Sequence, residues 1–357
     1  MSDPHDVARY IFVNDENELR SGWRVLLFLI TLFVVATLLA VLGRALATLF
    51  PSIAFVFIIP PAPDYSGSPA EVVPLCVSTA MNLLAAVIAS IVCASLLERR
   101  RFGSVGFKLH RGWSRDFALG SLLGAASLAI AVGIAASFGA VTFDLQTREF
   151  GLLLRGFLIT LAFFVIAGAN EELIFRGFPF QALVHNLRGP KAVAITSLIF
   201  GLAHASNPEA SVFSTINTIL AGIWLGIAYL MTRSLWLATA LHWSWNFAMV
   251  FIFGLPVSGL TTLGAFSWLR GSPGEPGWIS GGGYGPEAGV AATLALILST
   301  LAIWKSGLFA ASQEMLNAIR HGKAQPAFVK VTPESEGSAV TDQDGASESG
   351  SSTMSNP

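Results

Sequence analysis

The stretch "FLITLAFFVIAGANEELIFR", residues 157–176, is an apolar run that ends in two adjacent acids and an arginine. From Phe157 to Ala169 it has no charged residue and no proline. Such a run predicts a helix that can enter a lipid bilayer. Ionisable side chains are costly at membrane depth and usually serve a function there. Because Glu171, Glu172 and Arg176 follow directly, the stretch predicts a membrane helix that carries a polar site near its end.

The rest of the chain is equally apolar. Of its 357 residues, 53% are hydrophobic and 12% charged, and the mean hydropathy is +0.64. A soluble domain has about 25% charged residues. We therefore predict an all-α, polytopic membrane bundle of about eight transmembrane helices with a polar intramembrane cavity. The apolar segments are 23–46, 73–97, 116–138, 156–174, 192–206, 211–232, 234–255 and 287–304.

Basic residues in the loops predict the orientation, because cytoplasmic loops are enriched in Lys and Arg. The 98–115 loop has five arginines and one lysine, and the 47–72 loop has neither. Both termini are therefore expected in the cytoplasm, in the inner membrane of a bacterium. We divide the chain into a cytoplasmic leader (1–22), N-terminal transmembrane helices (23–146), a catalytic helical core (147–256), an outer loop with the last helix (257–310), and a polar, disordered cytoplasmic tail (311–357).

Composition also excludes some functions. A net charge of −1 provides no basic field for nucleic acid. Cys76 and Cys93 lie 17 residues apart in one apolar run, too far apart on one helix for a disulfide. We interpret both as packing residues. The lipid bilayer is an expected partner, and no oligomeric state is indicated.

Helical spacing separates the roles of the two acids. Glu172 and Arg176 are four residues apart, so they share a helix face and can form an ion pair. Glu171 is rotated about 140° from Arg176 and is the unpaired acid. An alternative is that Glu172 and Arg176 form an ordinary pair at the membrane interface.

Two further motifs carry polar groups at membrane depth. "FGLAH" (200–204) places His204 four residues after Phe200, and "HWSWN" (242–246) places Asn246 four residues after His242. Each pair shares one helix face. The alternatives are a capped interfacial histidine for His204 and hydrogen bonding between helices for the other pair. Asn217 is interpreted as such an interhelical residue, and His185 as a loop residue.

The ordered triple "EELIFR", "FGLAH" and "HWSWN" resembles the CPBP family of intramembrane proteases. That family includes CAAX prenyl endopeptidases and bacteriocin-processing or self-immunity proteins. The resemblance covers about residues 155–255 and implies peptide hydrolysis in a membrane cavity. It implies five catalytic residues: Glu171 activates water with help from His204, His242 and Asn246 stabilise the oxyanion, and Glu172 shapes the site. It also implies that Arg176 and Phe200 support the site. The implied substrate is a membrane-bound or prenylated peptide.

The residues suit this chemistry, since hydrolysis of an amide needs a base for water and donors for the developing negative charge. No cofactor is expected. Zinc is the main alternative, with Glu171, His204 and His242 as its ligands, although HExxH is absent. A second alternative is a non-catalytic protein: a bacteriocin-immunity or binding protein of the membrane, or a small-molecule carrier.

Overall fold

Apolar helices make up most of the structure, a computed structural model that describes residues 11–14, 18–58 and 69–320. Side chains are not described at 69–71, 262 and 320. The predictions for leader residues 1–10 and 15–17 and for tail residues 321–357 lie outside this part of the chain.

Eight apolar helices correspond to the eight predicted segments. They are α2 (Ser21–Leu49), α4 (Pro69–Glu98), α5 (Trp113–Ser137), α6 (Phe150–Phe175), α8 (Gly189–Ala203), α9 (Val212–Thr232), α10 (Leu235–Phe247) and α12 (Val290–Lys305). Six of them, all except α8 and α12, are long and apolar enough to cross a membrane, when α6 is counted through Leu187 and α10 through Ile252. The predicted helical membrane bundle is confirmed.

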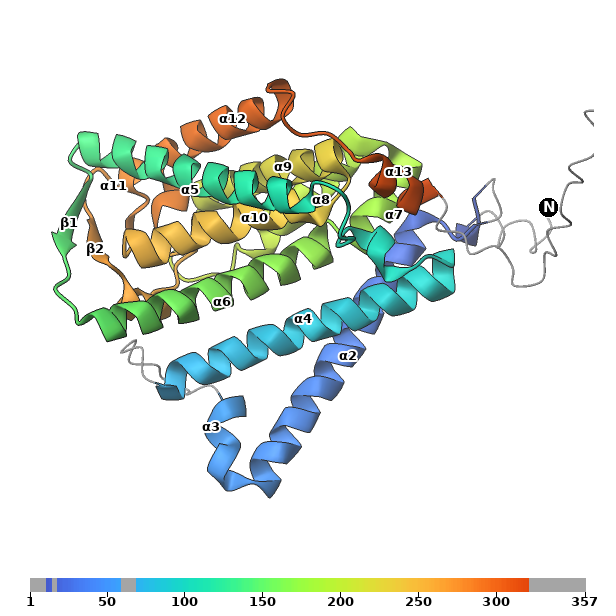
Figure 1. Ribbon diagram of the computed structural model, residues 1–357, viewed down its shortest axis with the longest axis horizontal. Coiled ribbons are helices and arrows are strands. Elements are labelled where there is room, and N and C mark those ends of the chain that lie inside the picture. The colour runs from blue at the N-terminus through green and yellow to red at the C-terminus, as the bar shows by residue number, and fades with distance from the viewer. Residues whose placement is uncertain (1–10, 15–17, 59–68, 321–357) are drawn as a thin grey trace, which may run out of the picture. The chain divides into compact units, whose positions relative to one another are not determined.

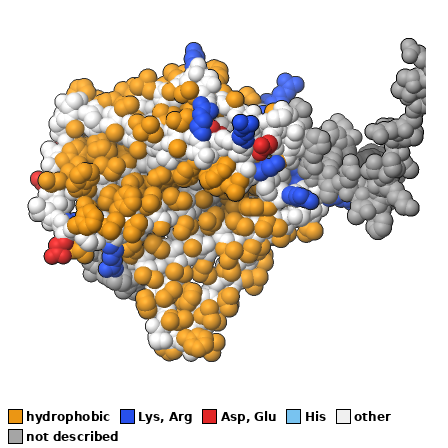
Figure 2. All heavy atoms as spheres, in the orientation of Figure 1, with side chains coloured by type: hydrophobic (Ala, Val, Ile, Leu, Met, Phe, Trp, Pro, Cys, Tyr) orange, Lys and Arg blue, Asp and Glu red, His pale blue; other side chains and the backbone are white. Residues whose placement is uncertain are grey.

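These segments form helices because lipid offers the backbone no hydrogen-bond partner, and a helix satisfies its own polar groups. Their outer surfaces are apolar. Large hydrophobic side chains such as Phe33 on α2 and Leu122 on α5 are exposed. Hydrophobic side chains cover much of the visible face (Figure 2). Such a surface suits hydrocarbon rather than water, and the protein is an integral membrane protein.

Two helices occupy segments that we predicted to be irregular. α7 (Phe178–Leu187) lies in the predicted 175–191 loop, so His185 is on a helix and not in a loop. Pro179 suggests a break, but it stands in the first turn of α7, where proline is tolerated. α13 (Gln313–Arg320) lies in the predicted disordered tail. Its Glu314 carboxylate accepts a hydrogen bond from the Arg111 amide at 3.1 Å, which attaches this helix to the bundle.

A two-stranded ribbon joins two segments that lie between the predicted apolar segments. β1 (Val141–Leu145) pairs antiparallel with β2 (Leu269–Pro273), with Asp144 opposite Arg270. Opposite charges facing each other across strands stabilise such a pair. The remaining short elements are α3 (Ala54–Phe57), α11 (Gly277–Ser280), a π-turn at Ala248–Ile252 and 3₁₀ turns at Pro51–Ile53, Phe102–Val105, Thr262–Phe266, Gly282–Tyr284 and Pro286–Ala288.

Close packing of α5 against α10 places the third motif in the middle of the bundle (Figure 1). A β-carbon at Gly120 would lie 2.8 Å from that of Ala240, and one at Gly124 would collide with the backbone oxygen of Leu241. Small residues at such positions let membrane helices approach closely. The two glycines, four residues apart, therefore hold the motif-bearing helix against α5.

Contacts between loops show which helix ends lie on the same face of the bundle. The β-ribbon joins the segment after α5 to the segment after α10, so these ends share one face. On the other face, Gly106 after α4 accepts a hydrogen bond from the amide of Leu235 at the start of α10. Arg100, also after α4, donates to Gln181 on α7 at 2.9 Å. This alternation is the one expected if each of the eight helices crosses the membrane once.

The orientation of these faces can be tested with two matched serines. Ser272 on β2 and Ser306 after α12 are both exposed, on opposite faces. After replacement of Cys76 and Cys93 by alanine, an impermeant maleimide added to intact cells is expected to label Ser272→Cys but not Ser306→Cys. Permeabilised cells should label both. The reverse pattern in intact cells would place the termini outside.

Candidate active site

Three helices carry the motif residues into one place. Glu171 and Glu172 lie near the C-terminal end of α6, His204 directly follows α8, and His242 lies in the middle of α10. The segments that bear them are separated by about 30 to 70 residues of chain. The site is therefore a product of helix packing.

The predicted ion pair between Glu172 and Arg176 is present and fully buried. Arg176 Nη1 lies 3.0 Å from Glu172 Oε1, and both side chains are inaccessible to solvent. Arg176 Nη2 donates to the carbonyl of Gly222 on α9 at 3.1 Å. The alternative of an interfacial, solvated pair does not fit this burial. The pair joins α6 to α9 inside the bundle.

The same carboxylate orients the first histidine. Glu172 Oε1 lies 2.9 Å from His242 Nδ1. An ionised carboxylate can only accept hydrogen bonds, so Nδ1 carries a proton and donates it to Glu172. The opposite ring nitrogen, Nε2, is left for the cavity. Glu172 thus holds both Arg176 and His242.

The second histidine is oriented by the backbone. His204 Nδ1 lies 2.8 Å from the carbonyl oxygen of Phe200. A carbonyl also only accepts, so Nδ1–H of His204 is the donor. As in His242, the tautomer follows from the partner. This contact explains the four-residue spacing of the motif, because the carbonyl of Phe200 meets the imidazole of His204 one helical turn later.

Glu171 lies between the two free ring nitrogens. Its Oε2 is 3.8 Å from His204 Nε2 and 3.8 Å from His242 Nε2. These distances are too long for direct hydrogen bonds, and Oε2 has no hydrogen-bond partner among the described residues. Oε2 itself is closed to solvent, although the Glu171 side chain as a whole is 31% exposed and lines the cavity. The arrangement therefore places one carboxylate against two imidazoles at the wall of a cavity.

Phe200 packs the polar groups together. Its ring lies 4.5 Å from the Arg176 guanidinium carbon, 4.6 Å from the His204 ring and 6.0 Å from the His242 ring. A guanidinium over an aromatic face is an attractive contact. Phe200 therefore separates the buried ion pair from the cavity and braces both imidazoles.

Asn246 lies one turn after His242 and lines the same cavity. Within the described part of the chain, no hydrogen bond joins its side-chain amide to another group. The amide is therefore available to a bound molecule. All five predicted catalytic positions are thus within or directly behind one cavity, with Glu172 behind it.

The cavity has a volume of about 350 Å³, within the range of small-molecule sites. Phe163, Phe164, Trp224 and Trp245 contribute apolar wall. The polar lining comes from the motif residues, from Asn217 and Thr218 on α9, and from loop residues. The loop residues are Asn207, Ser258 and Glu287.

Sequence reasoning missed Glu287. It lies in the turn Pro286–Ala288 just before α12, and its Oε2 accepts hydrogen bonds from the Ser258 amide at 2.7 Å and hydroxyl at 2.8 Å. The available signal was a lone acid at the start of the last apolar segment, in "GYGPEAGV" (283–290). Asn217 makes the interhelical contacts we expected, since its amide donates to the carbonyls of Glu287 and Gly289.

The three candidate zinc ligands are of the types that bind zinc. Both histidines present a free Nε2, and each Nδ1–H is held by an oxygen acceptor, as in many metal sites. However, no group of three or more His, Cys, Asp or Glu side chains in the described residues is placed to hold a metal ion. We therefore derive no step through a metal.

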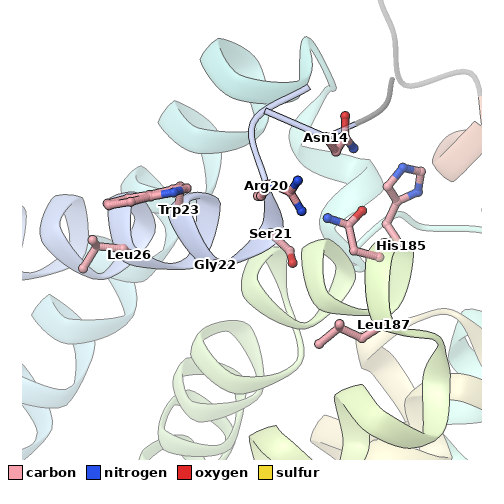
Figure 3. A pocket seen from close by; sticks show the side chains of 9 residues that line it. Asn14, Arg20, Ser21, Gly22, Trp23, Leu26, His185 and Leu187 are labelled. Carbon is pink, nitrogen blue, oxygen red and sulfur yellow. The ribbon is translucent and has the colours of Figure 1, made fainter. Parts of the chain in front are cut away.

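A second hollow lies elsewhere, beside the start of α2 and the end of α7 (Figure 3). Its volume is about 780 Å³, and Arg20, Trp23 and His185 are among its lining residues. It contains no motif residue and shares none of its walls with the smaller cavity. The chemistry is therefore assigned to the smaller cavity.

Comparison with known proteins agrees with the motifs. Residues 153–248 match the family described as type II CAAX prenyl endopeptidase Rce1-like. The matched segment contains all three motifs and runs from α6 to the end of α10. No curated protein matches the chain. The predicted family resemblance is confirmed for this segment, and the match supports a protease.

Proposed function

We propose that this protein is an intramembrane endopeptidase that uses Glu171 to activate water and His242 with Asn246 to stabilise the oxyanion. The observation that carries the proposal is the position of Glu171 Oε2, 3.8 Å from the Nε2 atoms of both His204 and His242. The atoms meet at the wall of a mostly apolar cavity, where water is excluded from all but a small volume.

In the first step, Glu171 takes a proton from the water while the hydroxide oxygen attacks the peptide carbonyl carbon. His204 Nε2 is an acceptor in its neutral form, so it can align the water from the other side. The protonated Glu171 then gives its proton to the leaving amine as the C–N bond breaks. The carboxylate is restored, and one water is consumed for each peptide bond.

His242 stabilises the oxyanion in its protonated form. Because Nδ1–H is committed to Glu172, only a proton on Nε2 allows donation into the cavity. Charge balance supports that form. Glu171, Glu172 and Arg176 together carry −1, and one proton on His242 makes the group neutral. A neutral cluster is less costly than a net charge in a low-dielectric site.

The Asn246 amide is the second oxyanion donor in this proposal, which leads to a specific kinetic expectation. Asn246→Ala should lower kcat by about 10²- to 10³-fold, because removal of one oxyanion donor typically has that effect, with little change in KM. Asn246→Asp should retain part of the activity. Steady-state kinetics on a cleaved peptide measures this. Unchanged kcat in Asn246→Ala would remove Asn246 from the mechanism.

We propose metal-independent catalysis. Purified protein should contain no stoichiometric zinc and should remain active in strong chelators. The motivation is the absence of HExxH and the amide of Asn246 in the third motif, a poor zinc ligand. Elemental analysis together with activity measures it. About one zinc per chain, lost together with activity in His204→Ala, would show that the enzyme is a zinc protease.

The proposed substrate is a membrane-bound or prenylated peptide, as the family description implies for the matched segment. The test is a comparison of membrane-protein termini in cells that express wild type or Glu171→Gln. New termini that appear only with wild type identify substrates directly. Identical sets of termini, with both proteins folded in the membrane, would contradict a protease.

A further inference from the structure

Two acids from different parts of the chain line the cavity. Glu171 lies on the α6 side and Glu287 on the side of the loop before α12, and both line the cavity. Among the described lining residues there is no Lys or Arg. Arg176 is fully buried and bound to Glu172. By the charge count given above, the group of Glu171, Glu172, Arg176 and protonated His242 is neutral, so Glu287 gives the cavity a net charge of −1 that an entering carboxylate would meet.

Glu287 is held in place by only one of its oxygens. Oε2 accepts both hydrogen bonds from Ser258, at 2.7 and 2.8 Å. No hydrogen bond within the described residues involves Oε1. The proposed chemistry at Glu171 makes no use of this side chain, and a carboxylate with one bound and one free oxygen is a ready acceptor for a donor on a ligand.

The backbone that carries Glu287 is rigid. Asn217 on α9 donates to the carbonyl of Glu287 at 2.8 Å and to that of Gly289 at 3.0 Å. Asn217 Oδ1 in turn accepts from the hydroxyl of Thr293 on α12 at 2.7 Å. A β-carbon at Gly289 would collide with the carbonyl of Ile279. The carboxylate is therefore preorganised, which is what a recognition group requires.

We propose that Glu287 is a specificity-determining residue that binds a cationic side chain, lysine or arginine, close to the scissile bond of the substrate, and that disfavours a carboxylate there. This inference rests on the proposed protease function and names a class of substrate for it. The reason is electrostatic complementarity, since like charges brought together in a partly desolvated site are strongly disfavoured.

The test compares peptides that differ by one residue. Variants of one cleaved membrane peptide carry Lys, Gln or Glu in turn at each of the three positions on either side of the scissile bond. With wild-type protein, kcat/KM should be at least about tenfold higher for Lys than for Glu at one or more of these positions, mainly through KM. Equal kcat/KM values for the Lys and Glu peptides at every position would overturn the inference. This part of the test uses wild-type protein alone.

Glu287→Gln connects the preference to this residue. The Lys-to-Glu ratio of kcat/KM should fall at least about tenfold in Glu287→Gln. Glu149→Gln, which removes the same charge from an exposed residue before α6, should keep the wild-type ratio. Equal ratios in wild type and Glu287→Gln would assign the preference to another group. If Glu287→Gln does not fold, Glu287→Asp should lower the ratio because it withdraws the carboxylate.

A binding measurement separates the two proposals. Fluorescent Lys and Glu peptides are titrated onto purified Glu171→Gln protein and onto the same protein with Glu287→Gln added. Tighter binding of the Lys peptide that is lost in the double variant supports the inference even where no cleavage is seen. Cleavage by wild type without any charge preference in binding would overturn the inference and leave the protease function intact.

Discussion

Replacing Glu171 with glutamine is expected to abolish peptide cleavage and leave the fold intact. Loss of a general base typically lowers the rate by about 10²- to 10⁴-fold, and in the proposed mechanism Glu171 is also the acid for the leaving amine. Its side chain is partly exposed to the cavity, and Oε2 lies 3.8 Å from each histidine. A glutamine of the same shape therefore breaks no direct hydrogen bond of Oε2.

The measurement is kcat on a cleaved peptide together with thermal unfolding in detergent. Glu171→Gln should unfold at the wild-type temperature, and Glu149→Gln should match wild type in both measurements. The opposite assignment of the two acids makes a clear alternative prediction. If Glu171→Gln still turns over while Glu172→Gln is stable but inactive, then Glu172 is the base.

Replacing Glu172 with alanine is expected to damage stability as well as activity. Removal of one partner from a buried ion pair costs about 3–5 kcal/mol, because the other charge is left without compensation. Here Arg176 is fully buried, and its remaining hydrogen-bond acceptor is the carbonyl of Gly222. His242 would also lose the partner of its Nδ1–H. Glu172→Ala should therefore give a low yield, a lower unfolding temperature and little activity.

A double substitution separates the stranded charge from lost packing. Glu172→Gln alone should be measurably less stable than wild type. Glu172→Leu combined with Arg176→Met removes both charges, and apolar replacement of a whole buried pair is often close to neutral. The double variant should thus be more stable than Glu172→Leu alone, yet inactive because His242 is no longer oriented. Equal stability of the single and double variants would mean that the buried charge of Arg176 is not the cause.

Spacing along the sequence predicted the helices themselves and the contacts that form within a single helix. The eight apolar segments became eight helices, because a long run without charges has no better structure in lipid. Glu172 and Arg176, four residues apart, form the predicted pair, since that distance along a helix fixes which side chains can touch. The same rule placed Phe200 next to His204. Segments such as α7 and the β-ribbon were missed because their stability comes from partners elsewhere in the chain.

Only the tertiary structure decided how the three motifs act on one another. The hydrogen bond from His242 to Glu172 joins residues 70 positions apart, and no local pattern encodes it. It changes the chemistry, because it commits Nδ1 and leaves Nε2 to face Glu171. The sequence by itself determined which residue types reach membrane depth and on which helices. Packing determined that Glu287, from a loop outside the motifs, shares their cavity, because distance along a chain does not limit distance in space.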